Sequence, residues 1–191
     1  MRTPDGLDEW RWRWMLVRHP RTERFFLLHA ATRPAGFQDI RVYGRDGISD
    51  ARLVWKVCHE CKRGVISKIS LSPQVQRQGL GTLLIDRALM EGPGYRWTTS
   101  SQSPDGRAFF QAVSARTGAE FTAGARTCEH ILESRAGRHK PILDRRLHAY
   151  AASRKVENAG SFYRQPRNLP IWPLLIVNCS PGLPVTLSGG L

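Results

Sequence analysis

Alternating apolar and polar residues mark the first half of the chain. Residues 10–14 alternate three tryptophans with two arginines, a period of two that predicts a strand with every Trp on one face. Residues 25–30 predict a second strand. Residues 40–43 and 51–57 predict a hairpin around a glycine-bounded turn, and 64–71 predict a further strand. The first half is therefore expected to be mostly antiparallel strands.

The hydrophobic period changes after these strands. Apolar residues at helical spacing predict an amphipathic helix over 80–88, and residues 95–99 predict a short strand. Ser103, followed by proline, begins a second helix that should end at Gly118, before a strand over 120–122. This order predicts a mixed α/β (α+β) domain, residues 1–148, with a central, mostly antiparallel twisted sheet.

Residues 149–191 differ from the rest of the chain. They lack a hydrophobic period and contain several prolines, which predicts a poorly ordered tail without its own core. The chain has 29 Lys and Arg against 16 Asp and Glu, a net charge of +13. Residues 135–191 hold 9 of the basic residues and only 2 of the acidic ones, a charge balance that suits a nucleic-acid partner. Scattered charges without an aromatic platform are nevertheless a weak nucleic-acid signal.

Membrane proteins and wholly disordered chains are excluded by hydropathy and composition. The longest apolar run, 171–177, contains a proline and is far shorter than the ~20 residues that a membrane-spanning helix needs. About 41% of the residues are apolar and 24% are charged, which suits a globular domain. The N-terminus lacks the basic-then-apolar pattern of a secretory signal, so we expect a cytoplasmic protein with no membrane partner.

The segment Gln76–Thr82, with glycines at 79 and 81, opens the first predicted helix. Glycines allow a ligand to approach the main chain closely, and the first turn of a helix presents unpaired N–H groups and the positive end of its dipole. Arg77 adds a positive charge. The segment therefore predicts an anion site suited to a pyrophosphate, beside a strand edge that offers main-chain groups to an extended amide-containing chain.

The strand Ile66–Pro73, followed by Gln76, Gly79 and Gly81, resembles the GNAT superfamily of acyl-CoA N-acyltransferases. The signature of that family is Gln or Arg, two residues, Gly, one residue, and Gly or Ala after a central strand. The resemblance covers roughly residues 51–122 and implies transfer of an acetyl group from acetyl-CoA to an amine. The implied cofactor-binding residues are Ile69, Ser70, Leu71, Gln76, Arg77, Gln78, Gly79, Leu80, Gly81 and Thr82.

The chain departs from the family pattern in its catalytic residues. Many members carry a Tyr on the second helix as general acid and a Glu on the central strand as base. Here the helix has Phe109, Phe110 and Ser114, and the strand has no carboxylate. The candidate replacements are Asp50, His59, Glu60 and Ser101, and the catalytic residues stay unknown. The stretch 31–39 is also too short for the two helices that usually shape the acceptor pocket.

These departures leave an alternative function open, in which the domain is a catalytically degenerate binding module. Its basic tail would then contact RNA or another acidic partner. The sequence disfavours the hypothesis of a P-loop nucleotide enzyme, because no Lys-Ser or Lys-Thr follows the glycines to bind the phosphates and the magnesium ion.

The cysteines suggest a metal site. Cys58 and Cys61 form a C-x-x-C turn at a hairpin, and Cys128 and His130 supply two further ligand types, so the four could form a structural zinc site. Two other interpretations stay open. The cysteines could be inert reduced thiols, or Cys58 and Cys61 could form a redox dithiol, although the thioredoxin-like redox motif begins a helix and Cys58 does not. Cys179 has no identifiable partner.

Overall fold

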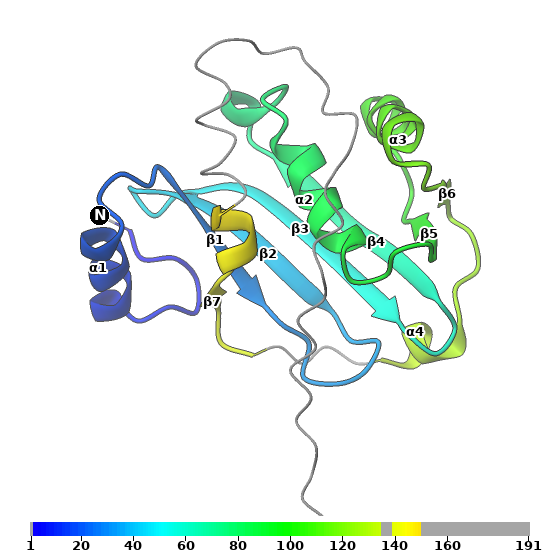
Figure 1. Cartoon of the computed structure of the whole chain (residues 1–191), viewed down its shortest axis with the longest axis horizontal. Coiled ribbons are helices and arrows are strands. Elements are labelled where there is room, and N and C mark those ends of the chain that lie inside the picture. The colour runs from blue at the N-terminus through cyan, green and yellow to red at the C-terminus, as the bar shows by residue number, and fades with distance from the viewer. Residues whose placement is uncertain (1, 135–138, 150–191) are drawn as a thin grey trace, which may run out of the picture.

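The computed structural model describes residues 2–134 and 139–149, and a twisted seven-stranded sheet dominates it (Figure 1). The predicted tail beyond residue 149, with Cys179 and the apolar run 171–177, lies outside the described residues, so the domain boundary stays a prediction. The strands are β1 (Arg24–His29), β2 (Gln38–Gly44), β3 (Ser49–Cys58), β4 (Arg63–Leu71), β5 (Arg96–Thr99), β6 (Phe121–Ala123) and β7 (Ile142–Leu143). The helices are α1 (Glu9–Arg18), α2 (Leu80–Leu89), α3 (Pro104–Thr117) and α4 (Glu129–Glu133), with a 3₁₀ turn η1 (Pro73–Val75).

The sheet has the spatial order β6-β5-β4-β3-β2-β1-β7. Strands β1 to β4 are antiparallel neighbours, whereas β5 and β6 run parallel to β4. The order strand, helix, strand, helix, strand from β4 to β6 follows the antiparallel half, as predicted. The mostly antiparallel sheet with its helices confirms the predicted mixed α/β fold class.

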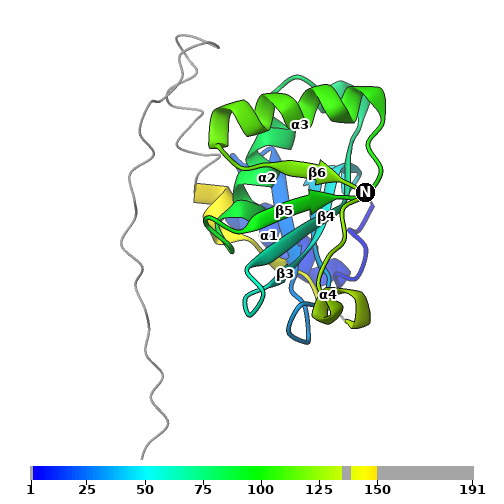
Figure 2. The same ribbon diagram turned by 90° about the vertical axis from the view of Figure 1, so that its right-hand side faces the viewer.

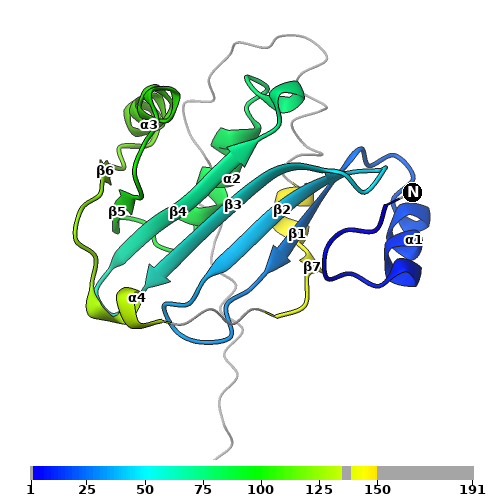
Figure 3. The same ribbon diagram turned by 180° about the vertical axis from the view of Figure 1, so that it is seen from behind.

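Strand β1 shows how the two faces of the sheet form separate cores. Phe26 and Leu28 point into the larger core with α2 and α3, whereas Phe25 and Leu27 point to the opposite face and pack with α1. Figure 2 shows α2 and α3 on one side of the sheet and α4 on the other, and Figure 3 shows that second side, with α1 near one end and α4 near the other.

The prediction of a strand at residues 10–14 is wrong, because these residues lie in α1. Trp12, Met15 and Leu16 are buried at i, i+3 and i+4, which is a helical stripe. Trp10 and Trp14, which a strand would place beside Trp12, are 70% and 55% exposed. The two-residue alternation therefore overlaps a longer helical pattern that the five-residue window did not reveal.

Residues 139–149 close the edge of the sheet beside β1, a contribution that the sequence did not predict. Strand β7 pairs with β1, and Asp144 accepts a 2.9 Å hydrogen bond from the buried guanidinium of Arg87 on α2. The Asp144 carboxylate also caps the helical turn over 145–149 by accepting from the N–H groups of Arg146 and Leu147. Leu147 is then buried in the larger core.

Two further observations concern the connection between β1 and β2 and the lengths of the helices. The connection 30–37 between β1 and β2 contains no helix, in line with the short stretch seen in the sequence. Every helix within the described residues is too short or too polar to span a bilayer.

Candidate cofactor site and cysteine cluster

The loop between β4 and α2 has the backbone conformation that a main-chain anion site needs. Gly79 lies in the left-handed region with φ of +76°, and a Cβ placed on it would meet nothing within 4 Å. Helix α2 begins at the next residue, and its first intrahelical bond runs from the N–H of Leu83 to the carbonyl of Gly79. The earlier N–H groups of the helix therefore have no partner within the helix, and the end of the helix at Gly79 is the positive end of its dipole.

Side chains hold this loop in place. The Gln78 amide donates to the carbonyl of Gln74 at 2.7 Å and accepts from Arg24 of β1 at 2.8 Å. Arg77 has φ of +58°, a left-handed conformation that is unusual for a residue with a side chain. Its side chain is exposed, so the guanidinium is free to approach a bound anion.

Strand β4 has a free edge next to this loop. β5 pairs with β4 only from Arg63 to Ile66, and the Ser100 N–H then donates to the carbonyl of Ile66 at 3.1 Å. Beyond that point β4 continues without a partner on this side, as Figure 3 shows. Its main-chain groups are available there to an extended chain, except two carbonyls: that of Ser67 accepts from the Ser100 hydroxyl at 3.1 Å, and that of Leu71 accepts from the Gln76 side chain.

Gly81 has a different environment from Gly79. A Cβ on Gly81 would lie 3.2 Å from Cε2 of Phe109 and 3.5 Å from Cδ1 of Leu71. The absence of a side chain at Gly81 thus lets Phe109 of α3 lie against α2, whereas the space beside Gly79 is open.

The predicted cofactor residues lie together at one end of β4 but differ in exposure. Ser70 and the loop residues 76–79 are exposed, Ile69, Leu71 and Thr82 are half-buried, and Leu80 and Gly81 are buried. The Leu80 side chain belongs to the larger core, so the prediction for this residue concerns its main chain alone.

The candidate replacements for the catalytic groups are scattered. Asp50 lies near the loop of residues 72–79 between β4 and α2, the predicted cofactor loop, because its carbonyl accepts from the Ser72 N–H and its carboxylate is 3.8 Å from Arg24. Burial raises the pKa of Asp50, with Arg24 opposing this shift. Ser101 is exposed just after β5, where β4 and β5 separate. His59 and Glu60 lie in the β3–β4 turn at the other end of β4, too far along the strand to serve the same site.

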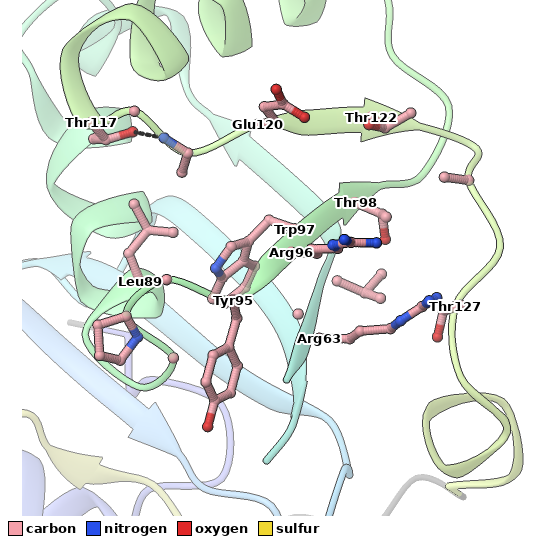
Figure 4. Close-up of a pocket in the computed structure, with 18 of the residues that line it drawn as sticks. Arg63, Leu89, Tyr95, Arg96, Trp97, Thr98, Thr117, Glu120, Thr122 and Thr127 are labelled. Atoms are coloured by element: carbon pink, nitrogen blue, oxygen red, sulfur yellow. Dashed lines mark hydrogen bonds between the residues drawn. The ribbon is translucent and has the colours of Figure 1, made fainter. Parts of the chain in front are cut away.

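A pocket of about 950 Å³ opens at the carboxyl ends of α2 and α3 (Figure 4). Arg63, Arg96 and Arg126 line it together with Trp97, which also covers Gly64 of β4. None of the predicted cofactor residues lines this pocket. It lies at the opposite end of α2 from Gly79, so the helix dipole there favours cations rather than a phosphate.

The four predicted metal ligands do come together. The ligand atoms of Cys58, Cys61, Cys128 and His130 all lie within 4.8 Å of one another. Nδ1 of His130 is 3.6 Å from Sγ of Cys58 and 3.3 Å from Sγ of Cys61. The three cysteines form no disulfide.

Lys56, two residues before Cys58 on β3, connects β3 to α4 through hydrogen bonds. Lys56 is buried, and its Nζ donates to the carbonyl of Ile131 at 2.7 Å and to the carbonyl and hydroxyl of Ser134. Nζ also lies 4.0 Å from the ring centroid of Phe37. Burial lowers the pKa of Lys56. These bonds hold α4 against β3. They thereby hold His130, which lies on α4, and Cys128, which directly precedes it, close to the cysteines of the β3–β4 turn.

Comparison with known proteins gives structural matches only. No family model matches the chain, and no curated protein matches it. Similar solved structures include a candidate acetyltransferase from Deinococcus radiodurans R1, 17% identical over 49% of this chain and 62% of that chain, with a TM-score of 0.38. Nourseothricin acetyltransferase is 20% identical over 36% of this chain and 52% of its own, with a TM-score of 0.27. An aminoglycoside N-acetyltransferase in complex with CoA is 17% identical over 49% of this chain and 66% of its own, with a TM-score of 0.34. The chain thus matches between about half and two thirds of the length of each.

Proposed function

We propose that this protein is an N-acyltransferase that moves an acetyl group from acetyl-CoA to an amine. The observation that carries the proposal is the start of α2, where the left-handed, open Gly79 precedes unpaired helical N–H groups beside the free edge of β4. This geometry supports a pyrophosphate over 78–82, because the helix end is positive and unobstructed. It also supports a pantetheine chain along 69–71, where no strand competes for the main chain.

In this reaction the amine attacks the thioester directly, and no covalent bond to the protein forms. The amine nitrogen bonds to the thioester carbonyl carbon, the carbon–sulfur bond breaks, and the amine's proton passes to the thiolate or to water. An alkyl ammonium with a pKa near ~10 must first lose a proton, so a base is required. Asp50 and Ser101 are the candidates near the cofactor end of β4, and we assign neither.

Calorimetric titration of acetyl-CoA into the purified protein tests the cofactor site. Gly79→Asp places bulk and negative charge where the pyrophosphate should lie, and it should weaken binding at least tenfold. Gly94→Asp is the matched control, because Gly94 also has a left-handed φ (+73°) and open space around its Cβ. A wild-type protein that does not bind acetyl-CoA, or two variants with equal effects, would contradict the proposal.

A screen of amine acceptors that measures release of the CoA thiol tests the chemistry separately. Turnover with some amine is expected. Acetyl-CoA binding without turnover on a broad amine panel would instead favour the binding module. In that case, deletion of residues 150–191 should lower a salt-sensitive affinity for RNA.

A further inference from the structure

We propose that Cys58, Cys61, Cys128 and His130 bind one Zn²⁺ ion in a closed Cys₃His site. Zn–S bonds of ~2.3 Å and a Zn–N bond of ~2.0 Å at tetrahedral angles place neighbouring ligand atoms roughly 3.5–3.8 Å apart. The His130 Nδ1 atom is 3.6 Å and 3.3 Å from two of the sulfurs, and all four ligand atoms lie within 4.8 Å of one another. The four side chains therefore already surround a space of the right size.

The β3–β4 turn has the conformation of a metal-binding knuckle. The main-chain N–H of Cys61 points at Sγ of Cys58 at 3.4 Å, a bond that strengthens when the sulfur is a metal-bound thiolate. Lys62, the next residue, has φ of +50°, so the chain reverses sharply directly after the second cysteine. This turn brings both sulfurs to one side of the hairpin.

His130 is oriented as a ligand through its second ring nitrogen. Nδ1 faces the sulfurs, while Nε2 lies 3.5 Å from Oε2 of Glu60. A carboxylate on the far nitrogen fixes the ring orientation and the tautomer that leaves the other nitrogen free for a metal. His59, the other histidine of the turn, faces away, with its Nδ1 3.2 Å from the hydroxyl of Tyr95.

The other two readings of these residues fit the geometry less well. Inert cysteines are usually small buried hydrophobes, but Cys61 and Cys128 are half-buried and the His130 side chain is 48% exposed. A redox dithiol would place its first cysteine at a helix start, whereas Cys58 ends β3. Three thiols and an imidazole are a donor set that zinc prefers.

The ion would be structural rather than catalytic, because four protein ligands leave no open coordination position. It would tie the β3–β4 turn to α4, which the Lys56 bonds hold from beneath. The site lies at the end of β4 opposite the cofactor loop, so this proposal does not rest on the acyltransferase function.

Metal analysis and cobalt substitution test the site on the full chain, purified under reducing conditions without an immobilised-metal column. About one zinc per chain is expected. Co²⁺ titrated into the zinc-free protein should give the intense visible bands of a tetrahedral ion and a thiolate charge-transfer band. Zinc well below one per chain, together with a cobalt spectrum lacking both features, would overturn the proposal.

Single substitutions assign the ligands. Cys128→Ser and His130→Ala should each lower zinc affinity at least a hundredfold, whereas the matched controls Cys179→Ser and His59→Ala should leave it unchanged. Because His130 is half-exposed, its loss should not unfold the protein, and His130→Cys should still bind zinc with a cobalt spectrum of four thiolates. Equal zinc affinity in Cys128→Ser and Cys179→Ser would also overturn the proposal.

Glu60→Gln examines the orientation of His130. The substitution should keep one zinc per chain but weaken its affinity by roughly tenfold or less, since the Glu60 side chain is 78% exposed. Loss of all bound metal in this variant would show that Glu60 is itself a ligand, and the Cys₃His assignment would be wrong.

Discussion

The two ends of β4 carry two different kinds of candidate site. At its carboxyl end, a single contiguous segment presents main-chain N–H groups at Gly79 and the start of α2. At its amino end, side chains from two distant segments meet, with Cys61 and His130 separated by 69 residues in the sequence. The first site depends on the local path of the backbone, and the second depends on the fold that brings α4 beneath β3.

This difference determines what should disturb each site. A main-chain site tolerates many side chains but not a change of backbone conformation or added bulk at the open position. A cluster of side-chain ligands tolerates only another metal-binding side chain at its four positions, and its occupancy stabilises the fold that holds it. Substitutions at one end of β4 should therefore leave the other end intact.

Removal of the metal should have the largest effect. An ion present at ~1,000 times its dissociation constant contributes about 4 kcal/mol to stability, which for a chain of this size corresponds to roughly 10 °C in Tm. We expect thermal unfolding to shift downward by this amount after chelation and to recover when zinc is added back. Acetyl-CoA affinity, measured below the lower Tm, should change less than twofold. A large loss of acetyl-CoA affinity after chelation would show that the two ends of β4 are energetically coupled, and the two sites would then not be independent.

Lys56→Met should have the next largest effect, on the cysteine end alone. It removes the ammonium that donates to Ile131 and Ser134, leaving buried carbonyls without that donor. Such a loss costs about 2 kcal/mol in the free energy of unfolding. Zinc affinity should fall roughly tenfold, since α4 would present its ligands less rigidly.

Chemical denaturation and zinc competition measure these two effects. Lys140→Met is the control, because Lys140 is exposed and its replacement should change neither quantity. If Lys56→Met and Lys140→Met behave alike, the Lys56 bonds do not hold α4.

Gly81→Val tests whether Gly81, unlike the open Gly79, serves the packing of α2 against Phe109. The added side chain would press on Phe109 of α3, and overpacking of this kind costs ~1–2 kcal/mol. Phe109→Leu should make room, so the double variant should recover stability in a denaturation experiment. Acetyl-CoA affinity should recover with it. Stability restored without affinity would show that Gly81 also leaves space for the ligand.

Much of this fold was predictable from the sequence, because most elements carry their own local signals. Ser103 before proline starts α3, where its hydroxyl accepts from the Gly106 N–H, and the left-handed Gly118 ends the helix. Helix α1 was missed because three alternating tryptophans imitate a strand, and only Trp12 of the three is buried. Strand β7 was missed because two residues are too short for a periodic signal, and its position depends on the distant Arg87–Asp144 ion pair.

For both candidate sites, the sequence identifies the residue types but not their orientation or packing. The four cysteine-cluster residues could be chosen from their chemistry, but the sequence could not show that His59 faces Tyr95 while His130 faces the sulfurs. The glycines at 79 and 81 looked equivalent, yet one is open and the other packs on Phe109. Such distinctions depend on tertiary contacts that sequence spacing does not encode.

Arg77→Gly should have the smallest effect on stability and a measurable one on the cofactor. Arg77 has φ of +58°, so glycine relieves left-handed strain while making the unfolded chain more flexible, and the two effects should cancel to within about 0.5 kcal/mol. Acetyl-CoA affinity should fall three- to fivefold, because an exposed charge near a phosphate contributes under ~1 kcal/mol. Ala35→Gly, at φ of +53°, tests the backbone effect without a charge change and should leave affinity unaltered. Calorimetry at low and high salt measures the difference: added salt should weaken binding less in Arg77→Gly than in the wild type, and equal salt dependence would remove Arg77 from the site.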